Sequence, residues 1–296
     1  MGDDSVLTGV VLPLALAVIM TTLGLSLTAA DFRRVVVEPR GVLIGLANLL
    51  LVSPLLAFAA AEAFGLEPVL AVGLVLLGAS PGGTLANLLT HLARGETALS
   101  VTMTAISSVA AVVTVPLWLG VAIDHFGAGL GDEVSMGGVV LKVLAITVVP
   151  LTAGMAYRAR RPERAAELEP RLKRVALVVF VGVVAGAVVS EWSNVRDSIG
   201  AVALAALALN VAAMAVSFSA ARLARLGDRR ATAIAMELGI HNSTLTIAVA
   251  SGIDPELAIP AAVYSAFMFL TAGAFARVMA VRNAGQVTIA VSHSAA

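Results

Sequence analysis

The chain has 296 residues, of which 59% are hydrophobic and 13% are charged. A soluble domain of ordinary composition carries about 25% charged residues, so most of this surface must face something other than water. The formal net charge is zero, which gives no indication of a nucleic-acid partner. Because the chain contains no cysteine, disulfides, thiolate metal sites and a thiol nucleophile are excluded. The composition therefore indicates an integral membrane protein in contact with the lipid bilayer.

Apolar segments long enough to cross a membrane recur along the whole chain. A helix needs about 20 apolar residues to cross the hydrocarbon core of a bilayer. Nine segments qualify: 5–29, 40–64, 68–92, 97–123, 135–157, 174–191, 198–221, 230–251 and 257–281. The first begins with acidic residues, so we interpret it as a span and not as a cleaved signal peptide. Since lipid cannot satisfy bare backbone groups, we expect an all-α polytopic membrane protein with nine transmembrane helices.

The connections between these segments alternate in charge. Lysine and arginine concentrate in one set, from Arg33 and Arg34 in the first connection to Arg282 after the last span, while the other set is mostly acidic. Cytoplasmic loops carry the excess of lysine and arginine, so the N-terminus is expected outside and the C-terminus in the cytoplasm. Residues 283–296 are expected to form a disordered cytoplasmic tail.

Two of the segments contain residues that interrupt a helix. The third contains GASPGGTLANLL (78–89), where Pro81 lacks a backbone N–H and two glycines follow it. The eighth contains MELGIHNSTLT (236–246), where Gly239 lies among polar side chains. The two spans run in opposite directions through the membrane. A single break is explained equally well by a kink or by close packing, but paired breaks in the two halves predict an inverted-repeat transporter whose site lies at the midplane.

Glu237 is the most informative polar residue in these breaks. A charge at the centre of a span costs about 2.5–3.5 kcal/mol on insertion scales, so it requires a partner. Asn87, Ser100 and Thr104 supply neutral oxygens, and a carboxylate with such oxygens favours a hard cation. A protonated glutamate that is hydrogen-bonded within the bundle is the alternative.

His241 is open to two interpretations. It is either a neutral hydrogen-bonding group or a protonatable partner of Glu237, and residues four apart meet only on an unbroken helix. As His241 is the only imidazole near the cluster, zinc or copper is not expected. The spans contain no HExxH motif and no paired catalytic carboxylates, so no enzyme activity is predicted.

Three stretches resemble the bile acid:sodium symporter family: GLSLTAADF (24–32), GASPGGTLANLLTHLARGETALSVTMTAIS (78–107) and MELGIHNSTLTIAV (236–249). The resemblance implies a secondary active transporter that carries an organic anion with sodium by alternating access. It also implies a core in which the two broken helices cross, with a panel domain beside it. The panel would comprise residues 1–34 and 126–195, and the core residues 35–125 and 196–282.

The resemblance further implies two sodium sites behind the crossing. The ligands of the first would be Asn87, Ser100, Thr104 and Glu237, although Ala86 replaces a serine of the family. The second would use Glu237 again, the carbonyls of Leu238 and Ile240, and His241 in place of a glutamine. The first site is therefore expected to be largely intact. The second is expected to be weaker, reorganised or replaced by proton coupling, and a proton-coupled or facilitative organic-anion transporter or exporter that uses Glu237 and His241 is the alternative function.

The organic anion is expected at the half-helix N-termini beside the breaks, where N–H groups favour negative charge. The residues implied to face it are Gly83, Thr84, His241, Asn242 and Ser243. Bile acids and smaller carboxylates fit equally well, and the direction of transport and the oligomeric state are left open. The expected location is the inner (plasma) membrane of a bacterium.

Overall fold

Helices form all the regular structure in the computed structural model, which describes residues 12–127, 129–130, 134–190 and 192–294. Within these ranges no strand occurs, and 87% of the described residues are helical. The expected all-α class is therefore confirmed. This outcome follows from the composition, because an apolar chain in lipid can satisfy its backbone groups only within helices or closed barrels.

The first half of the chain contains a divided segment, α6 and α7, and ends with the long helix α8. In chain order they are α2 (Leu12–Ser26), α3 (Ala29–Val37), α4 (Pro39–Ala47), a π-helical turn η2 (Asn48–Val52), α5 (Ser53–Ala63), α6 (Pro68–Gly78), α7 (Thr84–Leu92) and α8 (Thr97–Phe126). The predicted interruption of the third segment is confirmed, because α6 and α7 are separate helices with Pro81 between them.

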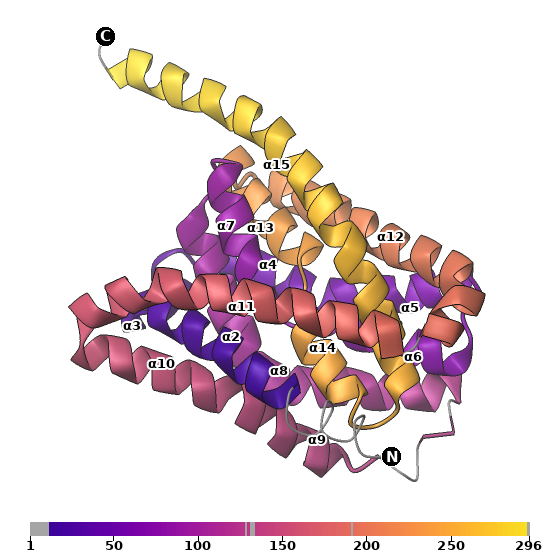
Figure 1. The fold of residues 1–296 in the computed structure, drawn as a ribbon. Coiled ribbons are helices and arrows are strands. Elements are labelled where there is room, and N and C mark those ends of the chain that lie inside the picture. The colour runs from indigo at the N-terminus through magenta and orange to yellow at the C-terminus, as the bar shows by residue number, and fades with distance from the viewer. Residues whose placement is uncertain (1–11, 128, 131–133, 191, 295–296) are drawn as a thin grey trace.

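The second half contains the other divided segment. Its elements are α9 (Met136–Val143), a π-helical turn η3 (Leu144–Val148), α10 (Val149–Arg160), α11 (Pro162–Ser190), α12 (Trp192–Leu223), α13 (Asp228–Gly239), α14 (Ser243–Ala250), a 3₁₀ turn η4 (Pro255–Ala258) and α15 (Ile259–Ser294). In Figure 1, α11 runs across the front of the molecule with α2 and α10 beneath it, and α15 extends beyond the other helices at its C-terminal end.

Two boundaries differ from the sequence prediction. The sixth helix begins at Pro162 and not near residue 174, so basic residues that the sequence places in a loop lie on α11. The tail expected to be disordered instead continues as part of α15 to Ser294, and Asn283 is buried with its amide donating to the carbonyl of Ala93 at 2.9 Å. Helix propagation explains the second difference, since nothing after Arg282 stops the helix.

Among the described residues, five continuous helices are long and apolar enough to cross a membrane: Pro39–Ala63, Thr97–Phe126, Met136–Arg160, Gly200–Leu223 and Pro255–Ala284. The pair Pro13–Ser26 and Ala29–Val37, bent by 67°, makes a sixth if it is counted as one span. The third and eighth predicted spans are each divided into helices too short to cross alone. The count of nine spans therefore stays a prediction.

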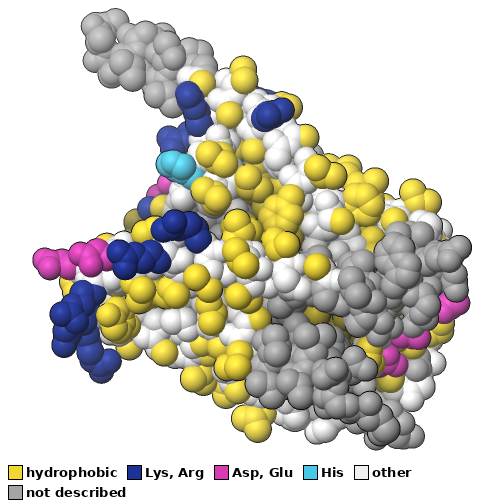
Figure 2. Space-filling view, viewed as in Figure 1, with side chains coloured by type: hydrophobic (Ala, Val, Ile, Leu, Met, Phe, Trp, Pro, Cys, Tyr) yellow, Lys and Arg dark blue, Asp and Glu magenta, His cyan; other side chains and the backbone are white. Residues whose placement is uncertain are grey.

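Large apolar side chains are exposed on the outside of the molecule. Leu43, Leu117, Val178 and Leu270 are each more than half exposed, and Figure 2 shows hydrophobic side chains spread over the visible face. Basic side chains gather at one edge, around the corner between α10 and α11 (Figure 2). An apolar surface of this extent fits contact with lipid.

Glycines allow α2 and α10 to pack backbone against backbone. A side-chain carbon at Gly24 would collide with the carbonyl oxygen of Leu151, and one at Gly154 with the carbonyl oxygen of Thr21. Small residues at such contacts are typical of membrane helices, where van der Waals packing drives association. The contact therefore depends on both glycines.

We expect Gly24→Ala to lower the melting temperature of the purified protein in detergent. The two backbones would have to separate, and such overpacking costs about 1–3 kcal/mol. The control is Gly273→Ala on α15, where a new methyl group would have no atom within 4 Å. Equal melting temperatures for the two variants would contradict the close contact.

Candidate functional site

The two helix breaks lie against each other and pair through their backbones. The Gly83 N–H donates to the Ile240 carbonyl at 2.7 Å, and the Asn242 N–H donates to the Pro81 carbonyl at 2.8 Å. Gly82 and His241 form an antiparallel bridge between these bonds. Each break thus satisfies backbone groups that the other leaves without an intrahelical partner. The predicted crossing of two broken helices is present, whereas the repeat relation between the two halves stays a prediction.

The glycines of the first break make room for the second. A side-chain carbon at Gly82 would collide with the carboxylate of Glu237, and one at Gly83 would lie 3.1 Å from the carbonyl oxygens of Ile240 and His241. Pro81 explains why the helix ends here, since it has no N–H to continue the helical hydrogen bonds. The Pro-Gly-Gly sequence therefore both opens the helix and admits Glu237.

Glu237 is fully buried at the end of α13 and is surrounded by oxygens from α7 and α8. Ser100 Oγ lies 2.5 Å from Glu237 Oε1 and 2.8 Å from Asn87 Oδ1. Thr104 Oγ1 lies 2.9 and 3.0 Å from the two carboxylate oxygens and 3.4 Å from Asn87 Oδ1. The structure thus brings together all four side chains that the sequence assigns to a first sodium site.

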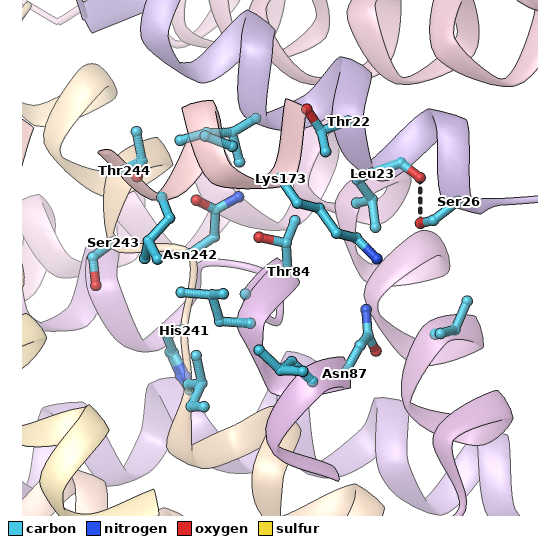
Figure 3. A pocket seen from close by; sticks show the side chains of 18 of the residues that line it. Thr22, Leu23, Ser26, Thr84, Asn87, Lys173, His241, Asn242, Ser243 and Thr244 are labelled. Carbon is cyan, nitrogen blue, oxygen red and sulfur yellow. Dashed lines mark hydrogen bonds between the residues drawn. The ribbon is translucent and has the colours of Figure 1, made fainter. Parts of the chain in front are cut away.

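A pocket of about 550 Å³ lies on the other side of the crossing. Its wall includes all five residues expected to face a substrate: Gly83, Thr84, His241, Asn242 and Ser243. Asn87, a predicted sodium ligand, also reaches this wall (Figure 3). Helices α7 and α14 both begin at the pocket, so the positive ends of their dipoles face it.

Asn242 has an unused donor at this pocket. Its Oδ1 accepts from the Leu245 N–H at 3.1 Å and so caps α14. Its side-chain amide nitrogen has no hydrogen-bond partner, although the residue is only 5% exposed. A buried donor without an acceptor costs free energy, so the pocket offers a place for an acceptor on a ligand.

Residues 13–218 match the Sodium Bile acid symporter family. This chain belongs to that family. It is 32% identical over 251 residues to the uncharacterized sodium-dependent transporter YocS of Bacillus subtilis, a match that covers 84% of this chain and 77% of the relative. The relatives of this symporter family member are transporters and not enzymes, and the family is sodium-dependent.

Two eukaryotic relatives are matched over a smaller share of their own length than the Bacillus subtilis protein is. The hepatic sodium/bile acid cotransporter of Rattus norvegicus is 32% identical over 154 residues, which cover 52% of this chain and 42% of the relative. The probable chloroplastic sodium/metabolite cotransporter BASS2 of Oryza sativa subsp. japonica is 29% identical over 267 residues, which cover 88% of this chain and 62% of the relative. This chain therefore covers less than two thirds of the length of either relative.

The groups assigned to a second sodium site already have hydrogen-bond partners in this structure. The Leu238 carbonyl accepts from the Tyr264 hydroxyl at 3.3 Å, and the Ile240 carbonyl accepts from Gly83. His241 Nε2 lies 2.7 Å from Ser53 Oγ. Among the described residues no ion pair or hydrogen bond joins His241 to Glu237, because the helix is broken between them. The second site therefore stays a prediction.

Asn210 and Tyr264 were missed by the sequence reasoning. The Asn210 amide donates to the Gly239 carbonyl at 2.8 Å and to the Tyr264 hydroxyl at 2.9 Å, and the Tyr264 hydroxyl also lies 3.1 Å from the Gly239 carbonyl. These two side chains fix the end of α13 against α12 and α15. In the sequence each is one of several polar side chains in a largely apolar span, and this weak signal did not single them out.

We expect Tyr264→Phe to lower the melting temperature in detergent more than Tyr157→Phe does. The first substitution leaves buried groups without their hydroxyl partner, which costs about 1–3 kcal/mol. Tyr157 is 39% exposed and serves as the matched control. If both variants had the same melting temperature as the unsubstituted protein, the Tyr264 hydroxyl would have no role in holding the end of α13.

Proposed function

We propose that this family member is a sodium-coupled symporter of a small organic anion that works by alternating access. The observation that carries the proposal is an excess of acceptor oxygens around Glu237. The Ser100 and Thr104 hydroxyls have one proton each, yet they contact three acceptors for which no other donor is recorded among the described residues: both carboxylate oxygens of an ionised Glu237, and Asn87 Oδ1. Two protons cannot satisfy three acceptors.

A cation resolves this excess of acceptors. One carboxylate with neutral hydroxyl, amide and carbonyl oxygens is the ligand type that hard cations prefer. Within the described ranges no three side chains of histidine, cysteine, aspartate or glutamate gather as a metal site. We therefore assign Asn87, Ser100, Thr104 and Glu237 to the sodium ion and regard the ion as cargo. The Leu238 and Ile240 carbonyls and His241 are assigned to a second, weaker position.

The organic anion is assigned to the pocket beside the crossing. The N-terminal ends of α7 and α14 lie at the pocket together with the unpartnered amide of Asn242, although the Ala86 and Leu245 N–H groups already donate to the Gly83 carbonyl and to Asn242 Oδ1. Thr84 and Ser243 add hydroxyls to this wall. An acidic group bound here would accept hydrogen bonds from donors, such as the Asn242 amide, that have no acceptor among the described residues.

The two cargoes are linked through adjacent residues of one break. Gly82 lies against Glu237, whereas Gly83 and Thr84 line the anion pocket. Any shift of the break caused by one cargo therefore alters the position of groups that hold the other. Such a mutual effect on affinity is the requirement for symport, and sodium entry contributes about 2.3 kcal/mol per charge per 100 mV.

The pocket lies between the two groups of helices that we assign to panel and core. It is lined by α2 and α11 from the panel and by α7, α8, α14 and α15 from the core. Its α11 wall carries Lys173 and Arg174, which the positive-inside rule places toward the cytoplasm. We therefore interpret this conformation as inward-facing, in a bacterial inner membrane, with the N-terminus outside.

We expect Thr104→Val to abolish most of the stabilisation by sodium. The substitution keeps the shape of the side chain but removes a hydroxyl that contacts both carboxylate oxygens of Glu237. The sodium concentration for half-maximal thermal stabilisation should rise at least about tenfold, which corresponds to about 1.4 kcal/mol.

The matched control is Thr114→Val on the same helix, whose hydroxyl bonds only to its own backbone at the Ala110 carbonyl. Potassium at equal concentration controls for ionic strength. A Thr104→Val protein that sodium stabilises as strongly as the unsubstituted protein would reject this assignment.

The alternative function is proton-coupled transport through Glu237 and His241. Transport assays with either a sodium gradient or a pH gradient distinguish it from sodium symport. In proteoliposomes an inward sodium gradient at equal pH should drive accumulation of a labelled bile acid or 2-keto acid, and His241→Gln should retain it. Accumulation that follows a pH gradient without sodium, and that His241→Gln abolishes, would support the alternative instead.

A further inference from the structure

Two basic side chains on α11 line the pocket, and the proposed function uses them only to orient the pocket and not to bind the cargo. Lys173 and Arg174 belong to the pocket wall opposite the helix breaks, together with Glu169. Figure 3 shows the Lys173 side chain reaching into the pocket. The sequence placed both residues in a loop, but α11 begins at Pro162 and carries them along the pocket.

Positive charge exceeds negative charge on this wall. Lys173 Nζ lies 2.6 Å from Glu169 Oε1, and the other oxygen of Glu169 lies 3.8 Å from Arg158. Glu169 is thus shared between two cations. Arg174 bonds through Nε to the Pro170 carbonyl at 3.4 Å, and no ion pair recorded among the described residues involves it. The wall therefore has capacity for a further anion.

Lys173 can hold a ligand acid without losing Glu169. Its side chain is 60% exposed, while that of Glu169 is 19% exposed and is held between its two cations. An ammonium group has three donors, of which Glu169 Oε1 occupies one. A second carboxylate can therefore join the same ammonium group, and the Arg174 guanidinium offers further donors beside it.

Apolar side chains line much of the rest of the pocket. They come from α2, α7, α8, α11 and α15, and include Ile19, Leu23, Leu88, Val101, Leu177 and Met268. The pocket thus combines anion-binding groups at the breaks, apolar side chains and basic residues of α11. A volume of about 550 Å³ is in the range of pockets for ligands of drug size.

We infer that Lys173 and Arg174 form a second anion subsite, so that the preferred cargo is a dianion with an apolar segment between two acidic groups. The inference rests on the proposed function, because the first acidic group occupies the pocket end beside Asn242 and Thr84. The second acidic group pairs with Lys173 and Arg174. A cargo with one acidic group fills only the first position.

The test compares α,ω-dicarboxylates of increasing chain length with their half-methyl esters, which have matched length and one charge fewer. Binding is measured by calorimetry on the purified full-length protein in nanodiscs with sodium. At the best length the diacid should bind about tenfold more tightly than its half ester, since an exposed or partly exposed charge pair contributes modestly. Lys173→Met with Arg174→Gln should remove this difference and leave the half ester unchanged.

Two further variants complete the test: one is expected to raise the affinity for the diacid, and the other is a control. Glu169→Gln removes the competing carboxylate and should raise the affinity for the diacid. Arg171→Met removes an exposed charge from the same turn of α11 at a residue outside the pocket wall, and should change neither affinity.

Each other result overturns the inference in a recognisable way. Equal losses for diacid and half ester in the Lys173→Met, Arg174→Gln protein would mean that the basic wall holds a single acid. No loss for either ligand would leave the two residues as cytoplasmic-side charges only. If neither ligand class binds the folded, unsubstituted protein, the proposal of an organic-anion transporter is itself wrong, and the second subsite falls with it.

Discussion

The structure depends on the backbone pairing between its two broken helices. An interrupted helix in hydrocarbon exposes N–H and carbonyl groups, each of which costs several kcal/mol if it stays unsatisfied. The bonds from Gly83 to Ile240 and from Asn242 to Pro81 remove part of that cost for both breaks at once. The pairing thus holds the two breaks against each other where α7 and α14 begin and where Glu237 lies.

The sequence predicted the features that stand out against an apolar background. Pro81 with its two glycines, and Glu237 with His241 and Asn242, are conspicuous because such residues are rare or costly in a span. Ser100 and Thr104 were found through their spacing, which puts them on one face of α8. These local signals located the crossing and the whole cluster around Glu237.

The features that the sequence did not predict depend on contacts between distant spans. Nothing near Tyr264 or Asn210 indicates that they meet at the end of α13, because the two residues lie on different helices that also carry other polar side chains, such as Ser217 and Ser265. Lys173 had a sufficient explanation as a loop charge that fixes orientation. Its place in the pocket became visible only once α11 was seen to begin at Pro162 and to lie against α2.

If sodium binds at Glu237 and an organic anion binds in the pocket, as proposed, the charge of Glu237 also acts on the anion. The carboxylate is fully buried beside Gly82 and is not part of the pocket wall, which Gly83 and Thr84 line. Two unit charges about 10 Å apart at an effective dielectric constant of 20 interact by about 1.7 kcal/mol. A sodium ion that neutralises Glu237 would remove a repulsion of that order from the anion. Sodium binding and anion binding would then favour each other even before any helix moves.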